Sequence, residues 1–302
     1  MAGFLEGKNI AITGAGRGIG RAVALACAAE GANVVVADYG VGMDGSDPSS
    51  DVAEEVVKEI ADAGGTAVAV ASDVSTMAGG AEVVQAAIDN WGSIDGVVCV
   101  AGILRERMLF NMTEDEWDPV VAVHLKGHFT VFRAAAAAMR QQGSGSLVGF
   151  TSGAFQGSIA QANYAAAKGG VVSLVRSAAV GLKKYGITAN AIAPVARTRM
   201  SANVPGDLAE MGEAEDIAPM VVYLLSDQAK EITGQIYTVV GGKIAVWNQP
   251  QEVRAMYTDG RWTPEQIAAS LPSTVGVEKM PIFDILEEMA RKAREQRAEE
   301  GG

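Results

Sequence analysis

Positive charge, histidine and cysteine are all scarce in this chain of 302 residues. Its 24 lysines and arginines stand against 36 aspartates and glutamates, which gives a formal net charge of -12 at pH 7. Nucleic acids and anionic membrane surfaces are bound through basic patches, so this balance argues against either as a partner. The two histidines, His124 and His128, have no obvious carboxylate companions, so no metal site is expected.

A secretory leader and a disulfide framework are not indicated either. The N-terminus lacks the charged region and cleavage site of a signal peptide. The two cysteines, Cys27 and Cys99, stand in apolar runs and are expected as buried thiols, which suits a reducing cytosol. The uncharged run over residues 141–167 holds too many small polar residues for a membrane span. We therefore expect a cytoplasmic protein without a membrane partner.

Short apolar segments that alternate with helix-favouring ones are abundant. They predict strands over residues 9–13, 32–37, 66–71, 94–100, 146–151, 187–193 and 235–240. Helices are predicted from the first glycine-rich loop to residue 30, between residues 50 and 64, and over 77–91, 113–140, 159–185 and 214–225. Near-continuous apolar strands joined by helices predict an α/β fold with a doubly wound parallel sheet in three layers.

A glycine-rich loop, Gly14-Ala-Gly-Arg-Gly-Ile-Gly20, follows the first strand and opens the first helix. Glycines let such a loop turn tightly and approach a pyrophosphate at the helix N-terminus. Asp38 ends the second strand about 20 residues after Gly18, where dinucleotide folds place a carboxylate on the ribose hydroxyls. A carboxylate there repels a 2′-phosphate, so NAD is favoured over NADP, although Arg17 could pair with that phosphate.

A tyrosine and a lysine stand four residues apart in the alanine-rich run Gln161-Ala-Asn-Tyr-Ala-Ala-Ala-Lys168. Residues at this spacing share one helix face. In a cleft, the ammonium of Lys168 would stabilise the phenolate of Tyr164 and lower its pKa, so that the tyrosine could exchange protons with an alcohol or ketone. On its own, the pair favours an ordinary amphipathic helix with a surface lysine. Whether it is catalytic depends on the motifs in the rest of the sequence.

Together the motifs resemble the short-chain dehydrogenase/reductase family over residues 1–245. The resemblance is carried, in the family's order, by Thr13-Gly14-x-x-x-Gly18-x-Gly20, Asp38, Asp73-Val74, Ala101-Gly102, Ser152 and Tyr164-x-x-x-Lys168. It implies hydride transfer between a secondary alcohol or ketone and NAD(P), with Ser152, Tyr164 and Lys168 as catalytic residues. It places at the cofactor Gly14, Arg17, Gly18, Ile19, Asp38, Asp73, Val74, Val100, Ala101, Gly102, Tyr164, Lys168, Pro194 and Thr198.

The resemblance also implies a division of the chain and an assembly. Residues 1–244 are expected to form a dinucleotide-binding catalytic domain. Residues 245–302 are richer in charge and end in a helix predicted over 282–300, so they are expected to be a C-terminal extension that packs on this domain or on an oligomer partner. A homodimer or homotetramer is implied by the resemblance only.

A narrower likeness is carried by Gly102-Ile-Leu-Arg105, Val123-His-Leu-Lys-Gly127, Gln161-Ala-Asn-Tyr164 and Trp262-Thr-Pro-Glu265. These segments are similar to the (3R)-hydroxyacyl-CoA dehydrogenase unit of multifunctional enzyme type 2 and its single-domain bacterial relatives. The likeness implies a (3R)-hydroxyacyl-CoA or a bulky steroid-like alcohol as substrate. The alternatives are an NADPH-dependent 3-oxoacyl carrier-protein or broad carbonyl reductase, and a catalytically inactive dinucleotide-binding sensor.

The sequence departs from the family pattern at several site positions. Cys99-Val-Ala-Gly102 replaces the usual Asn-Asn-Ala-Gly, and Pro194-Val195 replaces Pro-Gly. His124 stands at the usual catalytic asparagine, where it either extends a proton relay or is a buried core histidine. The family spacing counted back from Tyr164 gives Thr151 as the catalytic hydroxyl. The strand count gives Ser152, which is preferred because loops absorb deletions more readily than strands.

Overall fold

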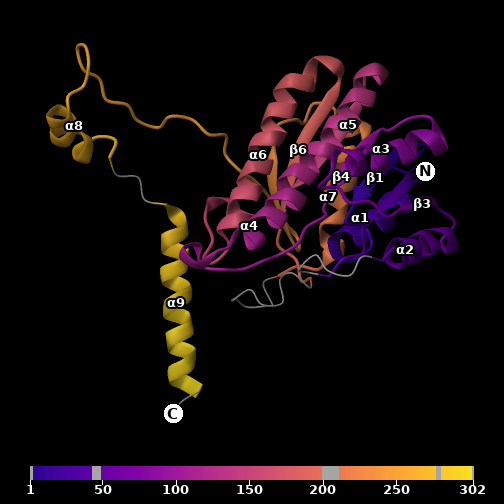
Figure 1. Ribbon diagram of the computed structural model, residues 1–302, viewed down its shortest axis with the longest axis horizontal. Helices are drawn as coiled ribbons and strands as arrows, with labels where there is room; N and C mark the ends of the chain where they lie inside the picture. The colour runs from indigo at the N-terminus through magenta and orange to yellow at the C-terminus, as the bar shows by residue number, and fades with distance from the viewer. Residues whose placement is uncertain (1–2, 43–48, 199–210, 277–279, 301–302) are drawn as a thin grey trace. The chain divides into compact units, whose positions relative to one another are not determined.

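The computed structural model of the protein describes residues 3–42, 49–198, 211–276 and 280–300. Within them, one sheet has the strand order β3-β2-β1-β4-β5-β6-β7-β8 (Figure 1). The strands are β1 (Asn9–Thr13), β2 (Asn33–Ala37), β3 (Thr66–Val70), β4 (Gly96–Cys99), β5 (Gly145–Phe150), β6 (Ile187–Pro194), β7 (Ile236–Val240) and β8 (Lys243–Val246). Strands β1 to β7 are parallel, and the order reverses between β1 and β4. The predicted doubly wound α/β fold is therefore confirmed.

Helices cover both faces of the sheet because successive strand residues point to opposite faces. Ile10 and Ile12 of β1 join one buried cluster, and Ala11 between them joins the other. The first cluster includes α1 (Gly18–Ala29), α2 (Asp51–Asp62) and α7 (Ala218–Leu225). The second includes α3 (Met77–Trp91), α5 (Gly127–Gln142) and α6 (Ala162–Leu182). The three layers follow from this alternation.

The long helix predicted over 113–140 is interrupted. It consists of α4 (Glu114–Val121), a π-helical turn η2 (Ala122–Lys126) and then α5. Pro119 lies inside α4 and has no N–H to donate to the carbonyl of Asp115. Arg105 Nη1 donates to that carbonyl instead, at 2.6 Å. The sequence pattern is helical on both sides of the turn, so it does not reveal the interruption.

Strand β8 was not predicted from the sequence. It pairs with β7 in the antiparallel direction and lies at the sheet edge. Trp247, which follows it, donates from Nε1 to Thr238 Oγ1 at 2.9 Å and stacks edge-on against Phe155 at a centroid distance of 4.7 Å. Most of β8 is exposed, so it has no apolar run that would identify it. The sheet thus continues past the domain boundary expected at residue 244.

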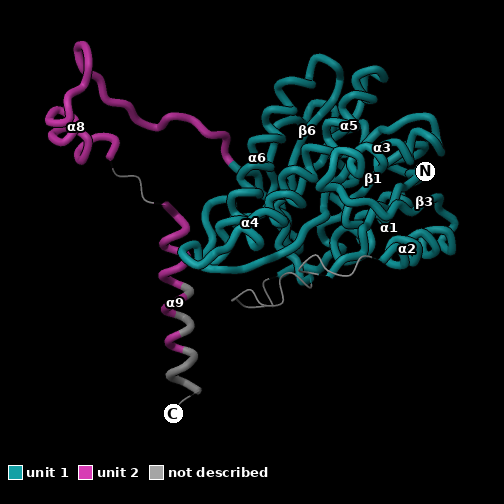
Figure 2. Tube along the Cα trace, in the orientation of Figure 1, with its two compact units in different colours: residues 1–247 teal, residues 248–302 magenta. Residues whose placement is uncertain are grey.

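The chain divides into two compact units, residues 1–247 and 248–302 (Figure 2). The first unit holds the whole sheet. The second holds α8 (Pro264–Ser270), a short 3₁₀ turn η9 (Leu271–Ser273) and α9 (Pro281–Glu300). Helix α8 begins with a capping box, in which Thr263 and Gln266 bond each other's backbone N–H groups.

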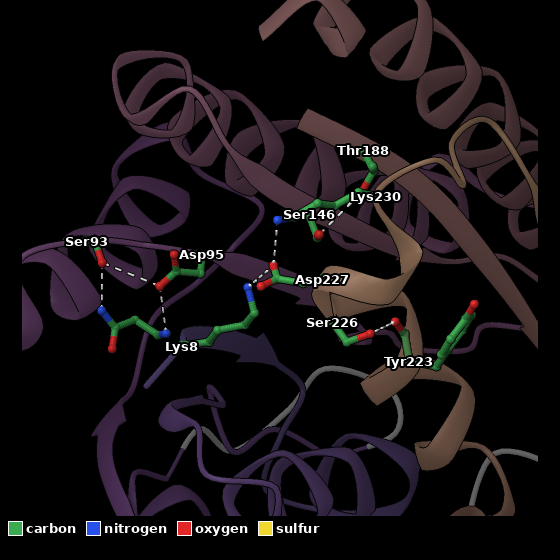
Figure 3. Close-up of polar contacts among 10 residues, drawn as sticks. Lys8, Ser93, Asp95, Ser146, Thr188, Tyr223, Ser226, Asp227 and Lys230 are labelled. Carbon is green, nitrogen blue, oxygen red and sulfur yellow. Dashed lines mark hydrogen bonds and ion pairs between the residues drawn. The ribbon is translucent and has the colours of Figure 1, made fainter. Parts of the chain in front are cut away.

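The amino edge of the sheet is held by ordinary polar contacts (Figure 3). Lys8, just before β1, lies 2.9 Å from the carboxylate of Asp227, and Asp95, just before β4, accepts the backbone N–H of Asn9 at 2.9 Å. Such partly exposed pairs contribute little stability. Doubly wound sheets bind their ligands at the opposite, carboxyl edge.

Of the described helical runs, residues 162–185 are the one long and apolar enough, by length and composition, to cross a membrane. This run comprises α6 and the turn after it. Val171, Val172 and Val175 of α6 are buried in the core on one face of the sheet. These are the contacts of a core helix in a globular domain, which passes the same composition test.

Candidate active site

Ser152, Tyr164 and Lys168 meet at the carboxyl edge of the sheet. Ser152 lies just after β5, and Tyr164 and Lys168 lie on consecutive turns of α6. The side chain of Ser152 lies near the phenol of Tyr164 and lowers its pKa. The Lys168 Nζ lies 5.4 Å from the centroid of the Tyr164 ring. The structure therefore brings the three proposed catalytic side chains together.

The geometry favours Ser152 over Thr151 as the catalytic hydroxyl. Thr151 is buried, and its hydroxyl donates to the backbone carbonyl of Lys168 at 2.9 Å. That bond directs Thr151 into the packing between β5 and α6. Ser152 is partly exposed and its Oγ accepts the N–H of Ala154 at 3.2 Å while contacting Tyr164. The spacing from Ser152 to Tyr164 is one residue shorter than the family spacing, and this deletion therefore lies in the loop before α6.

The expectation that Lys168 lowers the pKa of the Tyr164 phenol is wrong. Burial raises the pKa of Tyr164, and Ser152 lowers it only in part. Burial also lowers the pKa of Lys168 from 10.5 to about 7. The Lys168 amino group donates to the carbonyl of Phe150 at 2.6 Å. Desolvation therefore sets the direction of both pKa shifts, and the charge of Lys168 is not among the causes of the shift at Tyr164.

His124 lies in the π-helical turn with its ring edge against Tyr164, at a centroid distance of 5.0 Å. Its Nε2 lies 2.8 Å from the carbonyl oxygen and 3.2 Å from the amide nitrogen of Ile103. Its Nδ1 is buried and has no hydrogen-bond partner among the described residues. Burial, and then the charge of Lys168, hold the pKa of His124 well below 6.5. His124 is therefore a neutral, buried neighbour of Tyr164.

Asn163 is a site residue that the sequence reasoning missed. It is buried, and its Nδ2 donates to the carbonyls of Arg105 at 2.9 Å and Glu116 at 2.7 Å. Its Oδ1 accepts the N–H of Tyr164 at 2.7 Å. These contacts fix the first turn of α6 against α4 and the loop after β4. Its position directly before Tyr164 was the available signal, but its partners depend on the tertiary fold.

The glycine loop is packed too tightly for side chains. A Cβ on Gly14, whose φ is +66°, would lie 2.7 Å from the Cα of Ala101, and one on Gly20 would lie 2.0 Å from the Gly14 carbonyl oxygen. A Cβ on Gly18, at the start of α1, would lie 3.7 Å from the Thr198 side chain. Among the described residues, no side chain caps α1 and no acidic residue lies in its first turn. This helix start fits an anionic group such as a pyrophosphate.

The carboxylate of Asp38 closes the nucleotide side of the loop. Its oxygens accept the backbone N–H of Gly16 at 2.8 Å and of Gly40 at 2.7 Å. The side chain remains partly exposed, and each oxygen keeps a further lone pair that can accept a ribose hydroxyl. Arg17 is exposed in the same loop. The residues present thus fit a dinucleotide with the ribose at Asp38.

The other predicted cofactor residues line the same edge. Val74 is buried, and its carbonyl accepts the Thr130 hydroxyl at 2.6 Å. The neighbouring carboxylate of Asp73 accepts the Ser75 N–H at 2.9 Å. Val100 and Ala101 donate their backbone N–H groups to Thr13 at the end of β1. Ile19 lies in the first turn of α1, Gly102 follows β4, and Pro194 ends β6.

Within the described residues, no group of three or more His, Cys, Asp and Glu side chains is arranged to hold a metal ion.

Comparison with known proteins gives consistent matches. A family model described as "Enoyl-(Acyl carrier protein) reductase" matches residues 14–243. The chain is 43% identical to the hydroxyacyl-CoA dehydrogenase ChsB1 of Mycobacterium tuberculosis, over 88% of each protein. It is 36% identical to the peroxisomal multifunctional enzyme type 2 of Mus musculus, over 93% of this chain and 40% of that enzyme.

Two further matches have the length of a single domain. The 3-oxoacyl-(acyl-carrier-protein) reductase FabG of Staphylococcus epidermidis is 39% identical, over 78% of this chain and 98% of that protein. A solved short chain dehydrogenase from Mycobacterium avium superposes with a TM-score of 0.83 at 43% sequence identity, and the match covers 93% of this chain and 98% of that one. The family match covers well over half of the chain, and the relatives include a hydroxyacyl-CoA dehydrogenase and a 3-oxoacyl reductase. The chain therefore belongs to the short-chain dehydrogenase/reductase family, and it is an oxidoreductase of CH–OH groups that uses a nicotinamide dinucleotide.

Proposed function

We propose that the protein oxidises a (3R)-hydroxyacyl-CoA, or a similarly bulky secondary alcohol such as a steroid, with NAD as the hydride acceptor. The observation that carries the proposal is the contact of Tyr164 with Ser152 beside Lys168, on a chain similar to a hydroxyacyl-CoA dehydrogenase. The matches to that enzyme and to the multifunctional enzyme cover 88% and 93% of the chain. Both are too long to be confined to residues 1–247, whereas the match to the carrier-protein reductase covers 78%.

The bound dinucleotide would supply the carbon that accepts a hydride from the carbinol carbon of the substrate. Ser152 would donate a hydrogen bond to the substrate oxygen and hold it near the phenol. Tyr164 would take the hydroxyl proton during oxidation and return it during reduction. Lys168, held at the Phe150 carbonyl, would face the ribose of the nicotinamide and restrict the position of Tyr164.

The preference for NAD rests on Asp38. Its carboxylate stands at the end of β2 and is fixed by two backbone N–H groups. A 2′-phosphate at this position would meet a negative charge, and the exposed Arg17 would offset only part of that repulsion. Initial rates with NAD and NADP at equal concentrations test this assignment. A marked preference for NADP would contradict it.

Replacement of Tyr164 by Phe removes the proton carrier and keeps the ring. Tyr164→Phe should bind NADH with wild-type affinity, measured by its fluorescence, and lose about 10²-fold or more in kcat. Acetoacetyl-CoA with NADH serves as the assay. Tyr185→Phe is the matched control, since Tyr185 lies in the turn after α6 beside the Arg140 guanidinium. A wild-type kcat in Tyr164→Phe would show that Tyr164 is not the proton carrier.

A second candidate is reduction of a 3-oxoacyl carrier-protein substrate with NADPH, favoured by the 39% identity to such a reductase. The two functions differ in cofactor and in acyl carrier. Acetoacetyl-CoA and the same acyl group on acyl carrier protein, each tested with NADH and NADPH, separate them. Faster reduction of the carrier-protein thioester with NADPH would favour the second candidate. Self-association into a homodimer or homotetramer and a cytoplasmic location remain predictions of the sequence.

A further inference from the structure

His128, which has no role in the proposed mechanism, is buried in α5, and its two ring nitrogens face backbone groups. Nδ1 lies 2.5 Å from the carbonyl oxygen of His124. Nε2 lies 3.1 Å from the amide nitrogen of Phe150, which donates to it. A carbonyl can only accept and a backbone N–H can only donate. Both contacts are therefore satisfied by one neutral tautomer, with the proton on Nδ1.

The two residues that bond to His128 each contact one of the proposed catalytic side chains. His124 lies in the π-helical turn, and its ring packs edge-on against the ring of Tyr164. Phe150 ends β5, and its carbonyl accepts the Lys168 amino group at 2.6 Å. The imidazole of His128 therefore joins the turn that holds His124 to the strand end that holds Lys168.

We propose that His128 is a positioning residue that fixes the carbonyl of Phe150, and through it the amino group of Lys168, relative to Tyr164. It contacts none of the reacting atoms and acts by tying the π-helical turn to the end of β5. In a π turn the backbone hydrogen bonds run from i to i+5 instead of i to i+4, and here the Gly127 N–H bonds to the carbonyl of Ala122. His128 supplies a donor to that part of the helix and, with its other nitrogen, an acceptor to the strand.

The surroundings keep this bridge in one protonation state. Burial, and then the charge of Lys168, lower the pKa of His128 to about 3, against the carbonyls of His124 and Cys99, which raise it. The ring of Phe132 covers another side at a centroid distance of 6.0 Å. Gly149 leaves room for the imidazole, because a Cβ there would lie 3.3 Å from His128 Cδ2. His128 therefore stays a neutral imidazole at neutral pH, with its one proton on Nδ1, and holds the site in place.

The first test is independent of substrate and cofactor. The chain has two histidines, so the long-range ¹⁵N–¹H spectrum of the imidazoles contains two spin systems, and His128→Gln assigns them. We expect His128 as the Nδ1–H tautomer, with Nε2 at the shift of a hydrogen-bonded lone pair and no titration between pH 5 and pH 8. An Nε2–H tautomer, or titration within that range, would overturn the proposal.

The second test separates the two bonds. Asn places its amide nitrogen near the position of imidazole Nδ1, and Gln places its amide oxygen near that of Nε2. His128→Gln should therefore keep an acceptor for the Phe150 N–H, whereas His128→Asn keeps only the donor to His124. The proposal expects kcat with acetoacetyl-CoA and NADH to fall about 10- to 100-fold in His128→Phe and His128→Asn. His128→Gln should recover most of this loss, with KM for acetoacetyl-CoA changed less than about 2-fold.

The pH dependence gives a readout that packing alone would not move. If Lys168 is displaced, the limb of the pH–kcat profile to which it contributes should shift in His128→Phe and His128→Asn but not in His128→Gln. Equal kcat values and equal profiles for folded Gln and Asn variants would overturn the proposal, even if His128→Phe does not fold. The kcat, KM and pH-profile measurements rest on the proposed function. If wild-type protein fails to reduce acetoacetyl-CoA, the proposed function fails, and the tautomer measurement still decides the role of His128.

Discussion

At the scale of single residues, Asn163 shows how the position of Tyr164 depends on its neighbour. One buried amide satisfies two carbonyls, from the loop after β4 and from α4, and receives the N–H of Tyr164. Loss of the amide would remove two hydrogen bonds to these part-buried carbonyls, each of which typically contributes about 0.5–1.5 kcal/mol. It would also free the first turn of α6, on which the phenol is carried.

Asn163→Ala should therefore lower the free energy of unfolding by about 1–3 kcal/mol and reduce kcat as Tyr164 loses its fixed position. Urea denaturation and steady-state rates with acetoacetyl-CoA measure the two effects. Ser158→Ala is the control, since the exposed Ser158 donates only to Gln161 nearby, and it should leave both quantities unchanged. A stable and fully active Asn163→Ala variant would show that α6 alone positions the tyrosine.

The pKa shifts of Tyr164 and the buried histidines predict the direction of the pH dependence. Burial raises the pKa of Tyr164, so at neutral pH the phenol is protonated and ready to act as an acid in reduction. Oxidation needs the phenolate, so its kcat/KM should rise with pH, approaching tenfold per unit well below that pKa. The pKa values of both histidines are lowered below 6.5, so neither adds a limb near pH 7. Rates for (3R)-hydroxybutyryl-CoA with NAD between pH 6 and pH 9 test this, and a maximum below pH 7 would contradict it.

At the scale of structural elements, the π-helical turn between α4 and α5 places His124 under the loop after β4. Gly102 in that loop has no room for a side chain, because a Cβ would lie 2.2 Å from His124 Cε1. Gly102→Ala should therefore push the imidazole away from Tyr164 and lower kcat by up to about 10²-fold. Gly169→Ala, next to Lys168, is the control because its Cβ would meet no atom within 4 Å.

A double variant gives this prediction a sharper form. In Gly102→Ala/His124→Ala the clash is gone, so the two losses in kcat should be clearly smaller than additive. Additive losses would mean that Gly102 acts through another contact, such as the approach of the cofactor. The NADH affinity of each variant tests that alternative, because a clash confined to His124 leaves the affinity unchanged.

Elements marked by a local sequence pattern could be predicted, whereas features that depend on tertiary packing could not. Strands β1 to β7 were predicted because each is a short apolar run rich in β-branched or small residues and bounded by turn residues. Strand β8 escaped because Lys243, Ile244 and Val246 are exposed and only its pairing with β7 defines it. The π-helical turn escaped because five residues shift the helical phase without breaking the pattern.

The same distinction between local pattern and tertiary packing applies to the candidate active site. The motif order was enough to group Ser152 with Tyr164 and Lys168, and the structure brings their side chains together. The predicted direction of the Tyr164 pKa shift was wrong because the shift is caused mainly by burial, which the spacing of residues in a sequence does not report. The contacts of Asn163 and His128 join segments far apart in the chain, so no local pattern contained them.

At the scale of the whole molecule, the end of the sheet marks where the first unit is complete. Residues 1–247 form one compact unit, and its last residue, Trp247, donates its backbone N–H to Ile236 at 2.9 Å and its indole N–H to Thr238. Its ring also packs on Phe155, in the turn after Ser152. A chain that stops before β8 loses these contacts and exposes the edge of β7.

Two truncations test this boundary. Residues 1–247 keep every strand of the sheet, so they should unfold cooperatively and bind NADH with the affinity of the full chain. Residues 1–242 lack β8 and Trp247, so their thermal midpoint should fall by several degrees, since about 1 kcal/mol shifts it by 2–4 °C at this size. They should also aggregate through the bare edge of β7. Equal midpoints for the two truncations would mean that β8 adds no stability, and unfolding of residues 1–247 would mean that the sheet needs residues 248–302.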